Sequence, residues 1–331
     1  TYSAGRGGYG PAAPGNFALP VPDRFRPAIL DAEGDLDWRR QLDLGFDLID
    51  AHYFYPDGVA AAMLGKYFNK PVVITARGSD ITLFPQYALP RRMIKWAIGR
   101  AAGIITVCDA LREEILTLGA EPAKVVSLRN GVDLQLFQPV ERDSVRARLG
   151  MQRFTLLAVG HLVPVKAQEL IVAALAQLPD VELFIAGNGP NRQMLEQLAH
   201  TTGVAERVRF LGALPQTELR QYYGAADALV LPSEREGWAN VLLEAMACGT
   251  PVVASRVWGT PEVVAAPEAG ILMAERSAQG VADAVRSLRA NYPDRAATRR
   301  YAERFSWDDT SAGQLRLFRA ILSPSQAAAY A

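Results

Sequence analysis

The 331 residues, half of them hydrophobic, suffice for two cores, and the 35 basic and 35 acidic residues cancel, which argues against a nucleic-acid partner. Two cysteines are too few for a disulfide framework, and no apolar run approaches the roughly 20 residues of a membrane-spanning helix. We expect a cytoplasmic protein whose only membrane contact would be peripheral, at the inner face.

The N-terminal part of the chain is rich in glycine and proline and has no hydrophobic period. We expect residues 1–45 to be poorly structured, or to be the remainder of an incomplete N-terminal segment. From residue 46, short apolar runs alternate with helical patterns, as in FDLIDAHY, GVAAAMLGKYF and PVVITAR, which is typical of a parallel sheet. Residues 46–145 show about four strands where a doubly wound domain has about six, so we predict an incomplete first domain.

Two segments of this first domain follow predicted strands and should face a ligand. They are AHYFYPDG, with His52, and TARGSDI, with Arg77 and Asp80. In open parallel sheets, ligands bind beyond the carboxyl ends of the strands. His52 and Asp80 are therefore candidate catalytic residues, and Arg77 offers a fork of donors to a phosphate or an acceptor.

The segment at residues 90–100, PRRMIKWAIGR, predicts a helix that mixes basic and apolar side chains. The basic residues are Arg91, Arg92, Lys95 and Arg100, and the apolar ones are Met93, Ile94, Trp96 and Ile98. This pattern is compatible with a helix at a membrane surface, although most such helices simply cover a sheet. A docked helix would favour a lipid-linked acceptor.

A second series of strands follows a charged stretch around Pro139, which we interpret as a linker with the boundary near residue 145. The runs FTLLAVG, VELFIAG, RVRFLG, DALVLP and PVVAS predict a second doubly wound domain over residues 146–305. Residues 306–331 should form a helix, with a return to the first domain left open. Two such domains that face each other form a cleft.

The segment SEREGWANVLLEAMACGTPVVAS predicts a strand end, a loop, a helix over residues 238–248 and a further strand. The free N–H groups and the dipole at the start of such a helix suit a diphosphate. Glu236 lies in the loop ahead of the helix, and Glu244 lies on the helix itself. Without further context, two such carboxylates are more often a surface feature than a site.

The run E-G-x-x-N-V-x-x-E-A-M-A-C-G-T-P-V-V-A resembles the signature of retaining family 4 glycosyltransferases, which have the GT-B architecture of two facing Rossmann-like domains. The resemblance implies that Glu236 binds hydroxyls of the donor sugar and Glu244 the ribose, tasks that suit an acceptor-only carboxylate. It also implies that backbone amides contact the diphosphate and sugar, namely those of Gly237, Trp238, Asn240 and Val241. The Trp238 side chain can equally be a packed aromatic.

Other segments match the family in part. VGHLVPVKAQEL resembles the segment that holds the leaving diphosphate, and Lys166 falls on the family lysine, whose charge would stabilise the leaving group. His161 stands where the family commonly has arginine, so it is either a partly charged phosphate ligand or a loop cap. TARGSDI is a partial match, since many relatives have histidine in place of Arg77. NGVD resembles the interdomain segment, where Asn130 reaches the donor or forms the turn.

Two glycine-containing loops complete the expected donor site. FIAGNGPNRQM lacks the third glycine of a dinucleotide fingerprint, because Arg192 stands in its place. Gly187 and Gly189 are therefore expected to let the backbone pass close to the donor. FLGALPQ resembles the family's base-contacting segment, with Gly212 and Leu214 near the base.

The resemblance implies transfer of a hexosyl unit from a UDP- or GDP-sugar to a hydroxyl acceptor with retention at the anomeric carbon. It implies a glycan or lipid-linked acceptor in polysaccharide or cell-envelope assembly, and no metal or other cofactor. Two alternatives remain. A nucleotide-sugar-binding remnant without catalysis would lack the acceptor side, and an NAD-dependent oxidoreductase would need the glycine fingerprint that is missing here.

Overall fold

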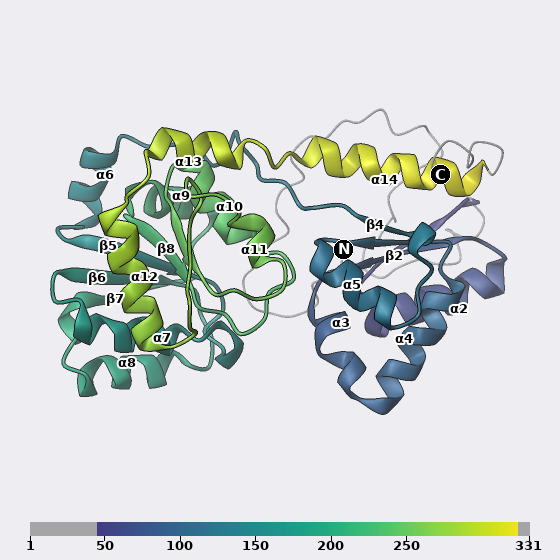
Figure 1. Cartoon of the computed structure of the whole chain (residues 1–331), viewed down its shortest axis with the longest axis horizontal. Helices are drawn as coiled ribbons and strands as arrows, with labels where there is room; N and C mark the ends of the chain where they lie inside the picture. The colour runs from purple at the N-terminus through teal and green to yellow at the C-terminus, as the bar shows by residue number, and fades with distance from the viewer. Residues whose placement is uncertain (1–44, 324–331) are drawn as a thin grey trace, which may run out of the picture.

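The computed structural model of the protein describes residues 45–323, which form two α/β domains (Figure 1). The first domain has a four-stranded parallel sheet in the order β1-β2-β3-β4. Its strands are β1 (Ile49–His52), β2 (Val72–Ala76), β3 (Gly103–Thr106) and β4 (Val125–Ser127). Its α-helices are α2 (Val59–Phe68), α3 (Ser79–Thr82), α4 (Ala88–Arg100) and α5 (Asp109–Thr117).

The second domain has a six-stranded parallel sheet in the order β10-β9-β8-β5-β6-β7. Its strands are β5 (Phe154–Val159), β6 (Val181–Ala186), β7 (Val208–Gly212), β8 (Ala228–Leu231), β9 (Val252–Ala254) and β10 (Gly270–Leu272). The helices that pack around this sheet are α6 (Arg142–Leu149), α7 (Gln168–Ala174), α8 (Arg192–Thr201), α9 (Gln216–Ala225), α10 (Asn240–Ala247), α11 (Thr260–Val263), α12 (Ala278–Ala290) and α13 (Arg295–Ala302).

The two parallel sheets with their helices confirm the prediction of two Rossmann-like domains. In the second sheet, β5 lies between β6 and β8, so the strand order reverses at β5. Such a switch point is where open α/β sheets bind ligands, since the loops after the two central strands part there. The edge strand β10 was not among the predicted strands, because its three half-buried residues form no long apolar run.

The strands are apolar because helices cover both faces of each sheet. Along β5, Leu157 and Val159 belong to one core cluster and Leu156 and Ala158 to another, since successive side chains of a strand point to opposite faces. The first of these clusters also contains most of the first domain's core. The two domains are therefore packed against each other through apolar contacts.

The chain passes between the domains twice. Where the passages meet, the Val132 amide donates to the Phe305 carbonyl at 3.1 Å. Helix α14 (Trp307–Leu322) then lies along the first domain (Figure 1), and Leu317 and Ile321 pack over Gly103 of β3. Gln314 donates to Asp50 of β1 at 2.9 Å. The last described helix is thus part of the first domain's packing.

Within residues 45–323, no helix is both long enough and apolar enough to cross a membrane. Helix α4 begins two residues before the segment expected at residues 90–100 and ends with it at Arg100, and it buries Ile94, Ala97 and Ile98 against the first domain. The expectation for residues 1–45 concerns a segment that, apart from Gly45, lies outside the described residues.

Candidate functional site

An ion pair lies at the switch point of the second sheet. Lys166 ends a short turn after β5, and Glu236 lies in the loop after β8. The Lys166 Nζ atom donates to the Glu236 carboxylate at 2.5 Å. The two loops are joined by a backbone hydrogen bond from Glu234 to Val165 at 2.8 Å. A fixed cation and a carboxylate therefore stand side by side where a ligand of this fold is expected.

The loop that carries Glu236 packs closely against the backbone of the first domain. A Cβ atom added to Gly237 would lie 1.9 Å from the carbonyl oxygen of Arg77, a distance that real Cβ atoms do not show. Only glycine fits there without moving one backbone away from the other. We call the group Lys166, Glu236, Gly237 and Arg77, with the start of α10, the interdomain site.

Helix α10 begins at Asn240, two residues after the predicted start, and no side chain of residues 45–323 caps its N-terminus. The first amides of the helix are therefore available for an anion. The Asn240 side chain accepts a hydrogen bond from Asn130 of the interdomain passage at 3.1 Å. Val241 is half-buried on the first turn. Asn130 and Asn240, predicted separately from two motifs, are thus brought together.

Trp238 is a packed aromatic in this structure. Its side chain is 7% exposed and lies 5.9 Å from the Phe305 ring, centroid to centroid. The indole Nε1 atom is buried and has no hydrogen-bond partner among the described residues. The side chain thus fixes the loop after Gly237, and the contact of its backbone amide with a donor stays a prediction.

Glu244 lies on the second turn of α10, and Tyr223 of α9 donates a hydrogen bond to its carboxylate at 2.7 Å. Burial raises the pKa of the Glu244 carboxyl above its usual range, and the Tyr223 hydrogen bond opposes this shift. Tyr223 was not recognised in the sequence, since the side chain that orients Glu244 comes from a different helix.

In the first domain, Arg77 and His52 form a pair at the ends of β2 and β1. The Arg77 guanidinium lies 2.8 Å from the Nδ1 atom of His52. Burial, aided by the charge of Arg77, lowers the pKa of His52 to about 4. The imidazole is therefore neutral near pH 7 and accepts from Arg77. The neighbouring Asp50, 3.7 Å from the His52 ring, has its pKa raised to about 6 by burial.

The Asp80 carboxylate points into the protein. It is buried and accepts hydrogen bonds from three backbone amides, those of Phe54 at 2.9 Å, Gly78 at 2.7 Å and Arg77 at 3.1 Å. These bonds hold the loop that contacts Gly237. In this geometry Asp80 positions Arg77, and its predicted catalytic part stays a prediction.

The remaining predicted residues lie in the loops after β5 and β6 and at the end of β7. His161 is exposed, and its carbonyl accepts from Gln168 at 2.9 Å. Gly187 and Gly189 allow a close approach of protein backbone, because added Cβ atoms would lie 1.9 Å from the Gly160 carbonyl and 2.4 Å from that of Leu162. The carbonyl of Gly212 accepts from Gly187 at 2.7 Å, and Leu214 is half-buried two residues further on.

One bridge between the domains was not found in the sequence. Glu262 of α11 accepts from the Ala110 amide at the start of α5 at 3.1 Å, and from Arg129 at 2.8 Å. No motif or spacing indicated it, because it depends on how the domains face each other. Within the described residues, no group of three or more histidine, cysteine or acidic side chains is arranged to hold a metal ion.

Two family models match the sequence. The model described as glycosyl transferases group 1 matches residues 140–305, and the model described as glycosyltransferase family 4 matches residues 5–136. The second match begins well ahead of residue 46, where the alternation of apolar runs and helical patterns starts. Together the two matches cover both described domains.

Among characterised proteins, the chain is similar to D-inositol 3-phosphate glycosyltransferases. It is 33% identical to that of Frankia alni over 312 residues, which are 86% of this chain and 76% of the relative. It is 36% identical to that of Mycobacterium tuberculosis over 231 residues, which are 65% of this chain and 48% of that relative. The matched region thus spans about half of the mycobacterial protein.

The fold is shared with solved structures. Sucrose-phosphate synthase from Thermosynechococcus elongatus superposes with a TM-score of 0.76 at 26% identity, over 87% of this chain and 76% of that one. Anabaena HepE in complex with UDP has a TM-score of 0.75 at 23% identity, over 83% of this chain and 79% of that one. Both similarities span the two domains.

Proposed function

We propose a donor and a reaction for this chain, which belongs to the family of glycosyl transferases group 1 and is a glycosyltransferase of the GT-B fold. The donor is a hexose linked to UDP or GDP, and the sugar passes to a hydroxyl acceptor with retention of configuration. The observation that carries the proposal is the Lys166–Glu236 pair at the switch point, beside the uncapped start of α10.

Each part of the interdomain site has a task in this reaction. The amides of residues 237–241 receive the diphosphate, and Lys166 stabilises the negative charge that grows on it as the bond to the sugar breaks. Glu236 accepts hydroxyl hydrogens of the sugar, and Glu244, oriented by Tyr223, accepts those of the ribose. In the absence of donor, Lys166 and Glu236 neutralise each other.

The first domain supplies the acceptor side. Arg77 is half-buried, and its side-chain hydrogen bonds within the described residues go to a neutral imidazole, while the charge of Asp50 acts on it without a direct contact. Its guanidinium can therefore pair with a phosphate or another anion of the acceptor. A glycan or lipid-linked acceptor of cell-envelope or polysaccharide assembly remains our first proposal. Because the relatives are named for inositol 3-phosphate, a phosphorylated polyol is the second acceptor class to test.

Calorimetric titration of UDP, GDP and their sugar conjugates tests the donor site. We expect one nucleotide to bind, and we expect Glu244→Ala to weaken it by about 100-fold, since hydrogen bonds to a charged group contribute about 1.5–3 kcal/mol each. Glu121→Ala, which removes an exposed carboxylate whose ion pair in the described part of the chain is with Lys124, is the matched control and should bind normally. Failure of both nucleotides to bind, or equal binding by Glu244→Ala, would contradict the proposal.

We also propose that the first domain docks on an anionic membrane through α4. Arg91, Arg92 and Lys95 line a hollow of about 460 Å³, and neither α4 nor the neighbouring α2 carries an acidic residue. Large apolar side chains are exposed on α4, at Tyr87 just ahead of it and on the neighbouring α2, namely Met63, Leu64, Tyr67, Tyr87, Leu89 and Trp96. Cations with exposed apolar neighbours suit the headgroup region of a bilayer.

Sedimentation with vesicles tests the docking. The chain should bind vesicles that contain phosphatidylglycerol, and glutamine at Arg91, Arg92 and Lys95 together should weaken binding by about 100-fold, at about 1 kcal/mol for each basic residue. A matched triple variant at Arg148, Arg192 and Arg286 of the second domain should still sediment. Binding that survives the first triple variant would reject this surface.

A further inference from the structure

A second cavity lies in the second domain, away from the interdomain site. Its volume is about 320 Å³, in the range of small-molecule sites. It is lined by Pro139 and Val140 of the interdomain passage, by Gly224, by Cys248 and Gly249 at the end of α10, and by Arg142, Arg295, Ala296, Arg299 and Arg300. Asp227 beside it directly precedes β8, so the cavity lies at the amino edge of the sheet, whereas the interdomain site lies at the carboxyl edge.

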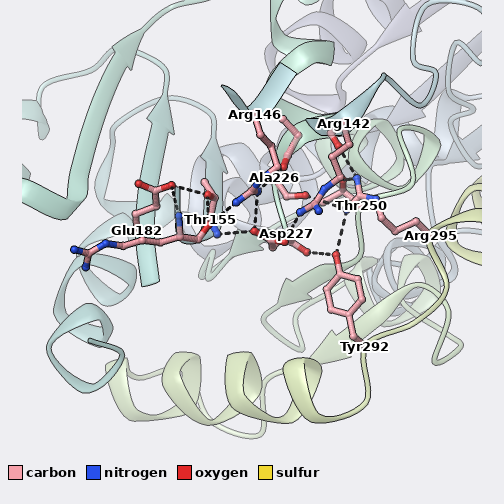
Figure 2. A network of polar contacts seen from close by, with 12 residues as sticks. Arg142, Arg146, Thr155, Glu182, Ala226, Asp227, Thr250, Tyr292 and Arg295 are labelled. Carbon is pink, nitrogen blue, oxygen red and sulfur yellow. Dashed lines mark hydrogen bonds and ion pairs between the residues drawn. The ribbon is translucent and has the colours of Figure 1, made fainter. Parts of the chain in front are cut away.

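The wall of this cavity carries unbalanced positive charge. Four arginines line it, and none of its described lining residues is acidic. Figure 2 shows Arg142, Arg146 and Arg295 gathered near a single carboxylate, that of Asp227. Asp227 accepts from Arg142 and, at 3.0 Å, from Arg146. The single charge of Asp227 is therefore already shared by two guanidinium groups, and Arg295 adds a third positive charge nearby.

Arg295 is held by neutral oxygens. It donates to the carbonyls of Gly224 and Ala226 at 2.7 and 3.0 Å, to Thr250 at 2.6 Å and to Tyr292 at 3.1 Å. These bonds fix the guanidinium, and burial lowers its pKa. The carboxylate whose charge acts on it, Asp227, already pairs with Arg142 and Arg146. A buried charge that shares its counter-ion with two others is costly, so a bound anion would be favoured there.

Arg299 and Arg300 extend the positive wall from α13. Arg299 donates to the carbonyls of Leu134 and Phe137 in the interdomain passage and to that of Ala247 at the end of α10. It also pairs with Glu303 at 2.8 Å, so its charge is partly balanced. Arg300 is 66% exposed, and its one ion pair within the described residues is with Asp294 at 3.8 Å. Within the described residues, the exposed Arg300 guanidinium thus has N–H donors left for a ligand. It lines the same cavity as the fixed charges of Arg295 and Arg299.

We propose that this cavity is a second ligand site, which binds a small phosphate-bearing anion through the free donors of Arg300 and the fixed charges of Arg295 and Arg299. Guanidinium groups suit this task, because their forked donors match the oxygens of a phosphate. The ligand also bridges α13 and the interdomain passage, so its binding stabilises the joint between the domains. This site is independent of the proposed sugar donor.

Calorimetry and thermal unfolding with inorganic phosphate, glucose 6-phosphate and glucose, at constant ionic strength, test the site. We expect saturable binding of a phosphate compound with a rise in Tm, and no binding of glucose. Tighter binding of glucose 6-phosphate would identify a sugar phosphate as the ligand, and equal binding would identify free phosphate. Either result supports the site. If neither inorganic phosphate nor glucose 6-phosphate binds saturably, the proposal is overturned.

Two variants locate the binding. Arg300→Gln should weaken it by about tenfold, since one exposed charge-assisted contact is lost. Arg286→Gln removes an exposed arginine of α12 and should leave the phosphate affinity unchanged. Lys166→Gln removes the cation of the interdomain site and should leave the phosphate affinity unchanged. If Lys166→Gln lost phosphate affinity and Arg300→Gln did not, the anion would bind in the interdomain site, and the proposed second ligand site would be rejected.

Discussion

Replacing Lys166 by alanine should lower kcat/KM for sugar transfer by about 10²- to 10³-fold, the usual loss when one fixed donor to a developing negative charge is removed. The Lys166 ammonium lies 2.5 Å from Glu236 at the switch point, so the contact holds it at the place where we propose that the diphosphate binds. The loss should fall mainly on kcat, because the charge on the leaving group grows as the reaction proceeds. The rate at which UDP or GDP is released from the donor identified by calorimetry measures this loss of activity.

Lys124→Ala is the matched control for this variant. Lys124 is a surface lysine that also pairs with a glutamate, Glu121 at 2.9 Å, but it lies far along the chain from the site. It should retain the wild-type kcat/KM. A Lys166→Ala enzyme as fast as wild type would remove the ammonium from the mechanism and leave only the amides of α10 to carry the diphosphate.

Gly237→Ala should lower activity by about 100-fold while the second domain still binds nucleotide. The new methyl group would lie 1.9 Å from the Arg77 carbonyl, so the Glu236 loop and the first domain must separate. Overpacking of this kind costs about 1–3 kcal/mol, and here the cost falls on the contact that assembles the site. Turnover and calorimetric nucleotide affinity, measured on the same preparation, separate the two effects.

Gly99→Ala supplies the comparison for the added methyl group. Gly99 lies on α4, and a Cβ atom there meets nothing within 4 Å. This variant should fold and react as wild type does, because alanine is also the better helix former. If Gly237→Ala kept full activity, the approach of Arg77 to the loop would not be needed for the reaction.

The sequence predicted the general fold because both domains are made of buried strands that read as apolar runs. It did not predict β10, whose three residues are half-buried at an edge. It also did not show that Lys166 and Glu236 touch. That contact requires β5 and β8, which are not consecutive strands, to be neighbours in the sheet. Strand order is a property of the folded chain and leaves no local pattern.

Several candidate residues turn out to face the protein itself. Gly187 and Gly189 were expected to approach a donor, and the structure has them against the backbone of residues 160–162. Asp80 was expected at a strand end facing the ligand, and it accepts three backbone amides. A motif identifies which positions are constrained, but a close backbone approach and a ligand contact impose the same constraint on a glycine. Only the folded structure shows which of the two constraints applies to a given glycine.

The position of α14 has a consequence for synthesis on the ribosome. Gly103 of β3 is covered by Leu317 and Ile321, so the first domain lacks part of its packing until the last described helix has been translated. The second domain has its described strands and helices by Ala302, ahead of α14, and can fold earlier. We therefore expect the second domain to fold before the first, although domains made first usually fold first. For the same reason, a cut between the domains would not yield two complete halves.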